Sequence, residues 1–385
     1  MQSKLAIKRN RSPSQKSDSR FDLLQSVEWD FADRTRHSDL EAIHPYPAKF
    51  IPDLPGTLLD LLSIEPGTAV LDPFVGSGTT LVECQKRGIP SIGIDLNPIA
   101  CMISSVKTNA LPKNFEPALE NVLEIAIKAR QAAIPEIPNL DHWFEKPIQI
   151  QIAKLIAAIE RAPIQFQDIF NLALSSILVR VSNQDSDTRY AAIQKGIIPE
   201  QIPTFFATAC RRVYAGLQHR NYDLVSATVL ERDTLSVTSR DLNKRIGAVI
   251  TSPPYPNAYE YWLYHKYRMF WLGHDPQRVK EREIGARAHF FKTNHHTAGD
   301  FVEQMRGTFN LIDSVLTPNG YACFVVGRSK IHGMVVDNAQ IIVDVARTFG
   351  FRVAYRTDRI IAANRKSFNL SHANIKTETI LVLAK

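Results

Sequence analysis

Cysteine is scarce in this 385-residue chain, and its four cysteines lie far apart. Cys84, Cys101, Cys210 and Cys323 form no CxxC pair, which argues against a zinc site and against a disulfide framework. Long apolar runs are missing as well. No stretch is long enough to cross a bilayer, and the N-terminus lacks the apolar segment of a signal peptide. These absences predict a soluble, cytoplasmic protein with no membrane partner.

Acidic residues are outnumbered by basic ones. There are 46 Lys and Arg against 39 Asp and Glu, a formal net charge of +7, which fits a polyanionic partner without requiring one. Residues 1–25 are basic and rich in serine, which predicts a disordered, solvated tail that could touch phosphates without sequence preference. The hydrophobic share of 44% allows a large core. The length predicts two structural units, or one with a substantial insertion.

The clearest strand-turn-helix signal covers residues 68–84. Residues 68–71 form an apolar run that predicts a buried strand, a turn with two glycines follows, and residues 79–84 open a helix. Gly76 and Gly78 let the backbone approach a ligand closely. A third glycine at the GxGxxG spacing is missing, and no Gly-Lys-Thr/Ser follows. The first absence weakens a dinucleotide fingerprint, and the second excludes a Walker A loop.

Two further segments belong to the same candidate site. A strand predicted at residues 91–94 is followed by Asp95 and Asn97, and an acid at that position can bind a ribose diol. Ahead of the glycine loop, residues 44–50 read His-Pro-Tyr-Pro-Ala-Lys-Phe, and leucines between positions 54 and 62 predict a helix. Alone, this segment predicts a rigid loop before a helix.

The most distinctive stretch is Thr251-Ser252-Pro253-Pro254-Tyr255. The apolar residues 246–250 before it predict a buried strand of a parallel sheet that ends at Ser252. Two consecutive prolines fix φ and donate no hydrogen bond, so the turn is stiff and its carbonyls can accept bonds from a ligand. A polar acceptor, free carbonyls and a ring suit a planar base with an amino group, bound at its edge and stacked on its face.

Together these motifs resemble the S-adenosylmethionine-dependent DNA amino-methyltransferases. That family carries Ser, Asp or Asn before Pro-Pro-aromatic in its catalytic loop. The resemblance covers about residues 40–110 and 225–385 and implies an α/β fold, a Rossmann-like seven-stranded methyltransferase sheet with a helical insertion. The catalytic residues that it implies are Ser252, Pro253, Pro254 and Tyr255. The cofactor-binding residues that it implies are Tyr46, Pro47, Ala48, Lys49, Phe50, Asp72, Pro73, Phe74, Gly76, Ser77, Gly78, Thr79, Thr80, Asp95, Asn97 and Asp233.

The order of the motifs resembles a permuted arrangement found in bacterial restriction-modification enzymes. It implies double-stranded DNA as substrate and a cognate restriction endonuclease or another defence-system component as partner. No metal is expected, because His295 and His296 have no clear partners for ligation. Methylation of cytosine at carbon 5 needs an attacking thiolate, typically in a Pro-Cys step. None of the four cysteines follows a proline, so that reaction is rejected.

Residues 101–226 carry apolar residues at helical spacing, which predicts a helical insertion. A polar stretch at residues 181–190, expected as a loop, is a candidate for target recognition, with a solvated turn as the alternative. Beyond Tyr255, aromatics alternate with Lys and Arg, which suits an unstacked nucleotide or a buried amphipathic helix equally. The DNA contacts predicted from these regions are Asn183, Arg189, Arg211, Arg212, Tyr259, Lys266 and Arg268.

The predicted organisation has four parts. They are a basic tail (1–25), the first part of the core with the cofactor site (26–100), the insertion as target-recognition region (101–226), and the second part of the core with the catalytic loop (227–385). In this last part the sequence predicts strands at 227–230, 321–327, 351–355 and 379–383, and helices near 301–316 and 338–349. The last two strands are expected to form an antiparallel hairpin.

The predicted reaction is site-specific methyl transfer from S-adenosylmethionine to the exocyclic N4 of a flipped cytosine. Hydrogen bonds from the amino group to Ser252 Oγ and to the Pro253 carbonyl would orient the nitrogen lone pair, and Tyr255 would stack on the base. In the family, Ser accompanies cytosine N4, whereas Asp or Asn accompanies adenine N6. Adenine N6 is therefore the alternative, followed by an RNA or protein substrate and by a silent DNA-binding module.

Overall fold

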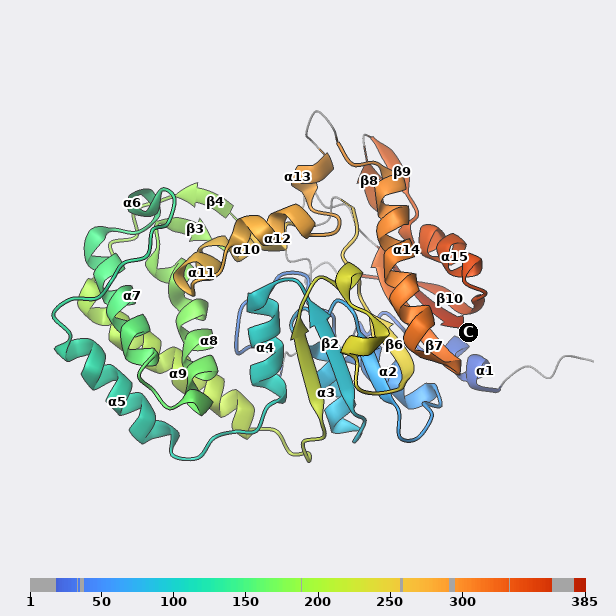
Figure 1. The fold of residues 1–385 in the computed structure, drawn as a ribbon, viewed down its shortest axis with the longest axis horizontal. Coiled ribbons are helices and arrows are strands. Elements are labelled where there is room, and N and C mark those ends of the chain that lie inside the picture. The colour runs from blue at the N-terminus through green and yellow to red at the C-terminus, as the bar shows by residue number, and fades with distance from the viewer. Residues whose placement is uncertain are drawn as a thin grey trace, which may run out of the picture.

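The computed structural model describes residues 19–32, 34, 38–187, 189–256, 259–290, 295–331, 333–361 and 377–385. In these ranges an α/β core lies beside a unit of helices, drawn in green at the left of Figure 1. A search of the described helices found none that combines the length and the apolar character needed to cross a membrane.

Seven strands form one sheet in the core. A strand that is covered on both faces needs apolar residues at successive positions, and all six residues of Ile246–Thr251 are buried. The order across the sheet is β10-β11-β7-β6-β1-β2-β5. The strands are β1 (Ala69–Asp72), β2 (Ser91–Asp95), β5 (Ala227–Glu231), β6 (Ile246–Thr251), β7 (Leu316–Gly327), β10 (Arg352–Ile360) and β11 (Thr377–Ala384).

Strand β11 runs antiparallel to its two neighbours, and the other strand pairs of this sheet are parallel. In the parallel part, Leu71 of β1 lies between Ile92 of β2 and Val249 of β6. The predicted Rossmann-like seven-stranded sheet is therefore confirmed. The closing pair β10 and β11 is the antiparallel hairpin that the sequence indicated.

Helices cover both faces of the sheet because successive strand residues point to opposite sides. Val70 and Ile250 pack on the face covered by α2 (Asp53–Leu61) and α3 (Thr79–Lys86). Leu71 and Val249 pack on the face covered by α14 (Ala298–Val315) and α15 (Asn338–Thr348). Complete burial of such a side chain is worth about 1.5–3 kcal/mol, so both layers hold β1 and β6 in place.

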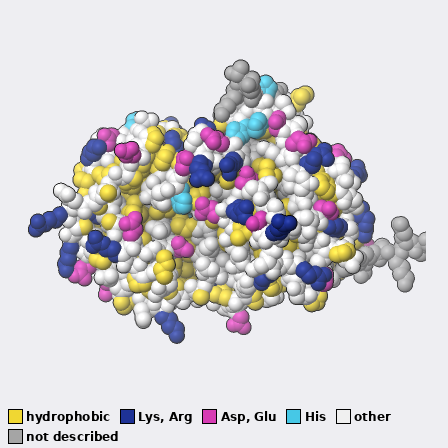
Figure 2. All heavy atoms as spheres, in the orientation of Figure 1, with side chains coloured by type: hydrophobic (Ala, Val, Ile, Leu, Met, Phe, Trp, Pro, Cys, Tyr) yellow, Lys and Arg dark blue, Asp and Glu magenta, His cyan; other side chains and the backbone are white. Residues whose placement is uncertain are grey.

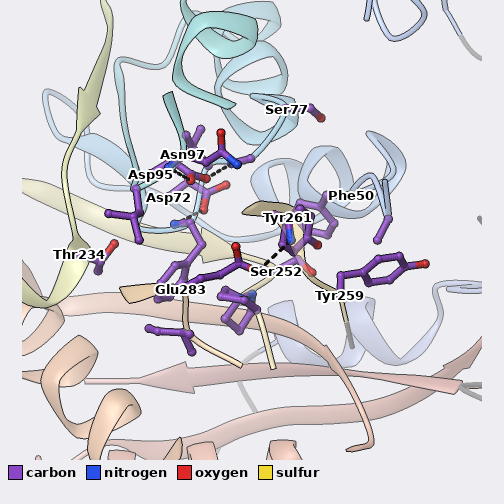
Figure 3. A pocket seen from close by; sticks show the side chains of 18 of the residues that line it. Phe50, Asp72, Ser77, Asp95, Asn97, Thr234, Ser252, Tyr259, Tyr261 and Glu283 are labelled. Carbon is purple, nitrogen blue, oxygen red and sulfur yellow. Dashed lines mark hydrogen bonds between the residues drawn. The ribbon is translucent and has the colours of Figure 1, made fainter. Parts of the chain in front are cut away.

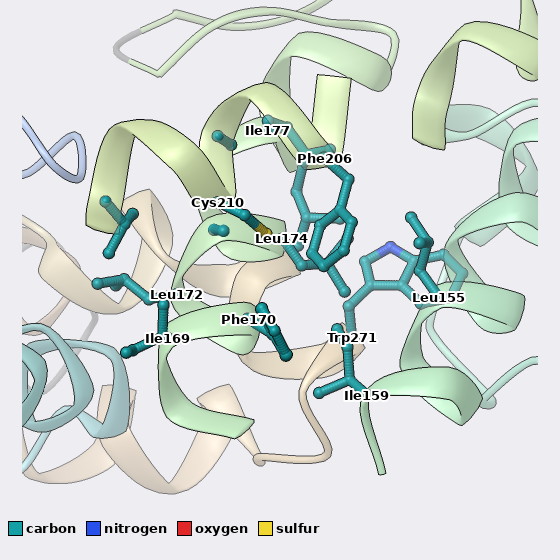
Figure 4. Close-up of a cluster of buried hydrophobic side chains, with 14 of the residues drawn as sticks. Leu155, Ile159, Ile169, Phe170, Leu172, Leu174, Ile177, Phe206, Cys210 and Trp271 are labelled. Carbon is teal, nitrogen blue, oxygen red and sulfur yellow. The ribbon is translucent and has the colours of Figure 1, made fainter. Parts of the chain in front are cut away.

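The helical unit shares its apolar core with the α/β core. Its helices are α5 (Phe115–Lys128), α6 (Leu140–Trp143), α7 (Lys146–Ile159), α8 (Ile164–Val181) and α9 (Ile202–Gln218). Their facing sides meet around Phe170 and Phe206 (Figure 4). The same cluster takes in Ile103 of α4 (Pro98–Thr108) and Trp271 of α11 (Lys266–Trp271). The unit is thus packed against the core and is continuous with it.

Several short elements escaped the sequence analysis. They are α10 (Tyr261–Tyr264), α12 (Pro276–Arg282), α13 (Arg287–Phe290) and two hairpins, β3 (Gln184–Ser186) with β4 (Arg189–Ala192) and β8 (Ser329–Ile331) with β9 (Met334–Val336). The first hairpin stands where a loop was expected at residues 181–190. Its strands are only three and four residues long and carry no apolar alternation that could predict them.

The N-terminal tail was predicted to extend to residue 25. Positions 1–18 lie outside the described residues. Ser19–Gln25 form helix α1, and Leu24 is completely buried in the cluster that also contains Leu58 of α2. The ordered part of the chain therefore begins before residue 26, because α1 supplies apolar side chains to the core.

Candidate functional site

The site lies where the direction of strand addition changes. From β1 the chain proceeds to β2 and then β5 on one side of the sheet, whereas β6 pairs with the other side of β1. In open α/β sheets a crevice forms at such a point, outside the carboxyl ends of the strands. Here β1 ends at Asp72 and β6 at Thr251, and Thr251 Oγ1 donates a hydrogen bond of 2.6 Å to Asp72 Oδ1.

A pocket of about 1130 Å³, counted with its open mouth, lies at this edge (Figure 3). It gathers most of the site residues that the sequence predicted. Those that line it are Tyr46, Ala48, Phe50, Asp72, Phe74, Gly76, Ser77, Thr79, Asp95, Asn97, Asp233, Ser252, Pro253, Pro254 and Tyr255.

The glycine loop between β1 and α3 is held from behind by α4. Ser104 Oγ donates to the carbonyl of Gly76, and Lys107 Nζ donates to the carbonyl of Ser77, both at 2.8 Å. Gly78 has φ +80°, and a Cβ there would lie 2.9 Å from Ser104 Cα. Glycine is therefore required for two reasons, because other residues rarely adopt this φ and because α4 leaves no space.

Asp95 joins the end of β2 to the glycine loop. Its Oδ2 accepts from Gly76 N and its Oδ1 from Asn97 N, both at 2.9 Å. Burial raises the pKa of Asp95 to about 6, although these hydrogen bonds lower it. Burial likewise raises the pKa of Asp72 to about 6. Asn97 Nδ2 is buried and finds no acceptor among the described residues. A ligand oxygen or ring nitrogen in this pocket would supply one.

The segment before the glycine loop contributes an aromatic wall. The Tyr46 hydroxyl lies 3.1 Å from the position that a Cβ would take on Gly76, so the tyrosine packs directly on the loop. Its ring also stacks on Tyr261, with centroids 5.6 Å apart. Lys49 points away from the pocket, and its Nζ donates to the carbonyls of Glu41 and His44.

The Ser252–Tyr255 loop forms the opposite wall. Ser252 is half-buried, and within the described part of the chain its hydroxyl makes no hydrogen bond. Gly285 supports the loop from outside with φ +72°, and a Cβ there would lie 2.6 Å from the carbonyl of Tyr255. The serine hydroxyl is thus held on a stiff loop and remains available to a ligand.

Five predicted cofactor residues do not line the pocket, namely Pro47, Lys49, Pro73, Gly78 and Thr80. The roles of Lys49 and Gly78 are described above. Thr80 is fully buried in α3, where its hydroxyl faces the carbonyl of Ile250 at 3.4 Å. Such residues shape the loop without facing its ligand, because a motif spans both the exposed and the supporting side of a turn.

Glu283 is a lining residue that the sequence analysis missed. It is buried directly after α12, and its carboxylate oxygens accept from Tyr261 N at 2.8 Å and Trp262 N at 2.7 Å. Burial raises its pKa to about 8. Tyr261, Arg282 and Glu378 also line the pocket without having been predicted. Tyr261 belongs to the aromatic stretch beyond Tyr255 that the sequence indicated, whereas Glu283, Arg282 and Glu378 come from segments without a motif.

The predicted DNA contacts fall into different environments. Arg268 is only 1% exposed, which corrects its prediction as a DNA contact, because a phosphate could not reach it. Arg211 and Arg189 are exposed but face Glu116 at 3.0 Å and Asp185 at 3.5 Å. Arg212 donates to Ser176 Oγ and Asn183 to the carbonyl of His142. Tyr259 lines the pocket, and Lys266 is half-buried beside it on α11.

No cluster of three or more His, Cys, Asp or Glu side chains arranged to hold a metal occurs in the described ranges. The carboxylates of the pocket accept hydrogen bonds from N–H and hydroxyl donors instead, as shown above for Asp72, Asp95 and Glu283. The chemistry that this arrangement can support is recognition of a polar ligand by carboxylates and backbone, beside a hydroxyl and aromatic rings.

Comparison with known proteins adds a sequence relationship. Residues 2–105 match the model of a family described as DNA methylase, N6_N4_Mtase. Type II methyltransferase M.MjaII of Methanocaldococcus jannaschii is 48% identical over 90 residues, 23% of this chain and 16% of that protein. Type II methyltransferase M.MvaI of Kocuria varians is 30% identical over 242 residues, 56% of this chain and 53% of that protein. The chain thus spans about half, or less, of the length of these relatives.

Among solved structures, the rRNA methyltransferase aviRa from Streptomyces viridochromogenes is similar at a TM-score of 0.34 and 12% identity. The likeness covers 91% of this chain and 93% of that one.

The bond between Thr251 and Asp72 can be tested by replacing Thr251 with Val, which keeps the shape but removes the hydroxyl. The pKa of Asp72 is higher in the folded protein than in the unfolded chain. The folded protein therefore loses stability as the pH rises from about 4, the unfolded value, to about 6, the folded value. Removing the Thr251 hydroxyl, which donates to the ionised Asp72 carboxylate, enlarges this loss of stability. We expect the free energy of unfolding to fall by about 1–3 kcal/mol at pH 8, and by clearly less at pH 5.

Urea unfolding at both pH values measures this difference. Thr251→Ser keeps the hydroxyl and serves as the control. The loss of its buried methyl group should lower stability by about 0.5–1.5 kcal/mol, and by the same amount at both pH values. An equal loss for Thr251→Val at pH 5 and pH 8 would contradict the assignment of the hydrogen bond to the ionised carboxylate.

Proposed function

We propose that the chain is a DNA methyltransferase that moves a methyl group from S-adenosylmethionine to the N4 amine of a cytosine rotated out of double-stranded DNA. One observation carries the proposal. The Ser252–Tyr255 loop and the segments with Tyr46, Asp72–Thr79 and Asp95 come from distant parts of the sequence and line one pocket. A methyl donor and its acceptor must meet in one such space.

The cofactor is S-adenosylmethionine, whose sulfonium supplies a reactive methyl group. The pocket suits it in three ways. Asp95 ends β2 where a ribose diol can be bound, and Asn97 Nδ2 lacks an acceptor within the described chain. Buried carboxylates such as Asp72 match the positive charge of the sulfonium and ammonium groups, since a buried charge needs an opposite partner.

The catalytic residues act by orientation. Ser252 Oγ and the Pro253 carbonyl accept hydrogen bonds from the exocyclic amine and turn its lone pair toward the methyl group. The N–CH₃ bond forms as the S–CH₃ bond breaks, and the positive charge moves to the amine, which then releases a proton. Tyr255 stacks on the base and stabilises that charge through its ring face.

The choice of cytosine N4 rests on Ser252. A serine hydroxyl is a weaker acceptor than a carboxylate, and Asp or Asn is expected at this position for adenine N6. Adenine N6 is the alternative, because the ring and both prolines would serve either base. RNA or protein substrates are less favoured because of Ser252 and the aromatic and basic stretch beyond Tyr255. A silent DNA-binding role is less favoured because cofactor and catalytic segments line the same pocket.

The sequence relatives support DNA as the substrate. The matched family is described as DNA methylase, and the two curated relatives are type II methyltransferases. A restriction endonuclease as partner belongs to the same proposal, because type II methyltransferases are named for restriction-modification systems.

A basic surface on α11 and α12 fits the DNA backbone. Four residues, which we call the α12 strip, compose it: Lys266 on α11 and Arg278, Lys280 and Arg282 on α12. Figure 2 shows Lys and Arg side chains gathered over this part of the molecule. Arg282 also lines the pocket. Among the described residues, none of the four has a carboxylate within ion-pair distance.

The strip also contains like charges that lie close together. Burial and then the nearby Lys280 lower the pKa of Lys266, and Lys280 Nζ lies 4.8 Å from the centre of the Trp262 ring. A phosphate would relieve this repulsion. Arg189 and Arg211 already face carboxylates, so we assign non-specific backbone contact to the strip and target recognition to the β3–β4 hairpin.

Arg278→Ala and Lys280→Ala should each weaken binding to mixed-sequence double-stranded DNA. Each removed phosphate contact should lower the slope of log K against log salt by about 1. Fluorescence anisotropy over a salt series measures the slope. Lys113→Ala, an exposed lysine between α4 and α5, should leave it unchanged. An unaltered slope in both strip variants would refute the assignment.

Ser252→Ala should lower methyl transfer to DNA by about 10²–10³-fold, the loss expected when one orienting hydrogen bond is removed from a transition state. Transfer is followed with S-adenosylmethionine labelled in its methyl group, and cofactor affinity by calorimetry should stay unchanged. Ser314→Ala removes a hydroxyl on α14 that only bonds the Leu311 carbonyl, and it should retain full turnover. Normal turnover by Ser252→Ala, or no transfer by the wild type, would overturn the proposal.

A further inference from the structure

Arg268 is the largest charged side chain in the interior, and it lies where three parts of the molecule meet. Its Nε donates to the carbonyl of Ser175 on α8 at 3.1 Å, and Nη1 donates to the carbonyl of Tyr264 on α10 at 3.0 Å. Its Nη2 donates to the carboxylate of Asp187, at the end of strand β3. One guanidinium thus holds the helical unit, the segment after the catalytic loop and the β3–β4 hairpin together.

Ser175 connects Arg268 to the segment that lines the cofactor pocket. Its hydroxyl is 2.9 Å from His44 Nε2, and His44 Nδ1 is 2.7 Å from the carbonyl of Pro45. The next residue is Tyr46, whose hydroxyl packs on Gly76 of the glycine loop. Every link from Asp187 to the glycine loop is therefore a hydrogen bond, an ion pair, a peptide bond or a direct packing contact.

A run of rings reinforces this path. The ring of His265 lies 6.2 Å from that of His44 and 5.4 Å from that of Tyr46, and Tyr46 in turn stacks on Tyr261. Burial, and then Arg268, lower the pKa of both histidines well below 6.5, so their rings are neutral. The ion pair of Arg268 with Asp187 is thus the charged link in the path.

We propose that Arg268 is a positioning residue that couples the β3–β4 hairpin to the cofactor pocket through Ser175, His44 and Tyr46. The inference rests on the proposed function, because it takes S-adenosylmethionine as the ligand that contacts Tyr46. Coupling between two sites is reciprocal. Cofactor bound against Tyr46 stabilises the β3–β4 hairpin against local opening. DNA bound to the hairpin in turn favours the arrangement of Tyr46 that binds the cofactor.

A merely structural arginine would stabilise the fold without this linkage. The difference lies in how the hairpin responds to the cofactor. If Arg268 only fills space and satisfies carbonyls, amide exchange in β3 and β4 is the same with and without cofactor. If it couples the two regions, exchange there slows when the pocket is filled, although the hairpin itself does not line the pocket.

Hydrogen exchange measured by mass spectrometry tests this on the full-length protein, with saturating S-adenosylmethionine and no DNA. In the wild type we expect exchange in β3 and β4 to slow by about fivefold or more, the lower range of allosteric coupling. The β8–β9 hairpin, on the other side of the molecule (Figure 1), should not respond.

Two variants should abolish the slowing. Asp187→Asn removes the charge that faces Arg268, and Ser175→Ala removes the hydroxyl that faces His44. Asp185→Asn is the matched control, because Asp185 lies in the same hairpin at a similar exposure, 27% against 30%, and its ion pair is with Arg189 of that hairpin. It should keep the response of the wild type. Thermal unfolding shows that each variant is folded before exchange is compared.

The outcomes separate the two proposals. If calorimetry finds no binding of S-adenosylmethionine to the wild type, the proposed function and the coupling both fail. If the cofactor binds but the hairpin does not respond, or if Asp187→Asn and Ser175→Ala respond like the wild type, the coupling alone fails. Loss of the response in these two variants, with the response retained in Asp185→Asn, supports it.

Discussion

The hydrogen bond between Thr251 Oγ1 and Asp72 Oδ1 joins the two halves of the site. Asp72 ends β1 and begins the glycine loop, and Thr251 ends β6 and precedes Ser252. The two strands are neighbours in the sheet although 179 positions separate these residues in sequence. Because both side chains are buried, the bond sets how the cofactor wall and the catalytic wall face each other.

Charge is distributed around this bond in an ordered way. The interior of the pocket carries Asp72 and Asp95, whose pKa values burial raises to about 6, so both carboxylates are ionised at neutral pH. The α12 strip adjoins the pocket through Arg282, which lines it. A cationic cofactor therefore matches the depth of the pocket and a polyanionic substrate matches its rim. This separation allows two ligands of opposite charge to occupy adjoining parts of one cavity.

The sequence predicted those parts of the fold in which local pattern and tertiary environment agree. Apolar runs such as residues 246–250 are strands because both faces of the sheet are covered, and the turn chemistry of Gly76 and Gly78 is local to its motif. The pocket walls could be predicted for the same reason. The glycine loop and the Ser252–Tyr255 loop are short segments that each leave a buried strand, so their positions follow once the strands are identified.

Other features depend on contacts between distant segments. Arg268 has the residue type of a DNA contact, but its surroundings, Ser175, Tyr264 and Asp187, make it an interior ion-pair residue. Glu283 entered the site because its carboxylate caps the backbone of α10. Neither position carries a local signal. Both arise from the way in which the helical unit and the α10–α12 segment pack against the core.

Identification of the methylated nucleoside shows which amine the Ser252–Tyr255 loop positions. The purified protein would be incubated with labelled S-adenosylmethionine and mixed-sequence double-stranded DNA, which is then digested to nucleosides and analysed by mass spectrometry. We expect N4-methylcytosine as the labelled product. N6-methyladenine would retain the cofactor and the loop but contradict the assignment of the base from Ser252, and labelled 5-methylcytosine would contradict the mechanism.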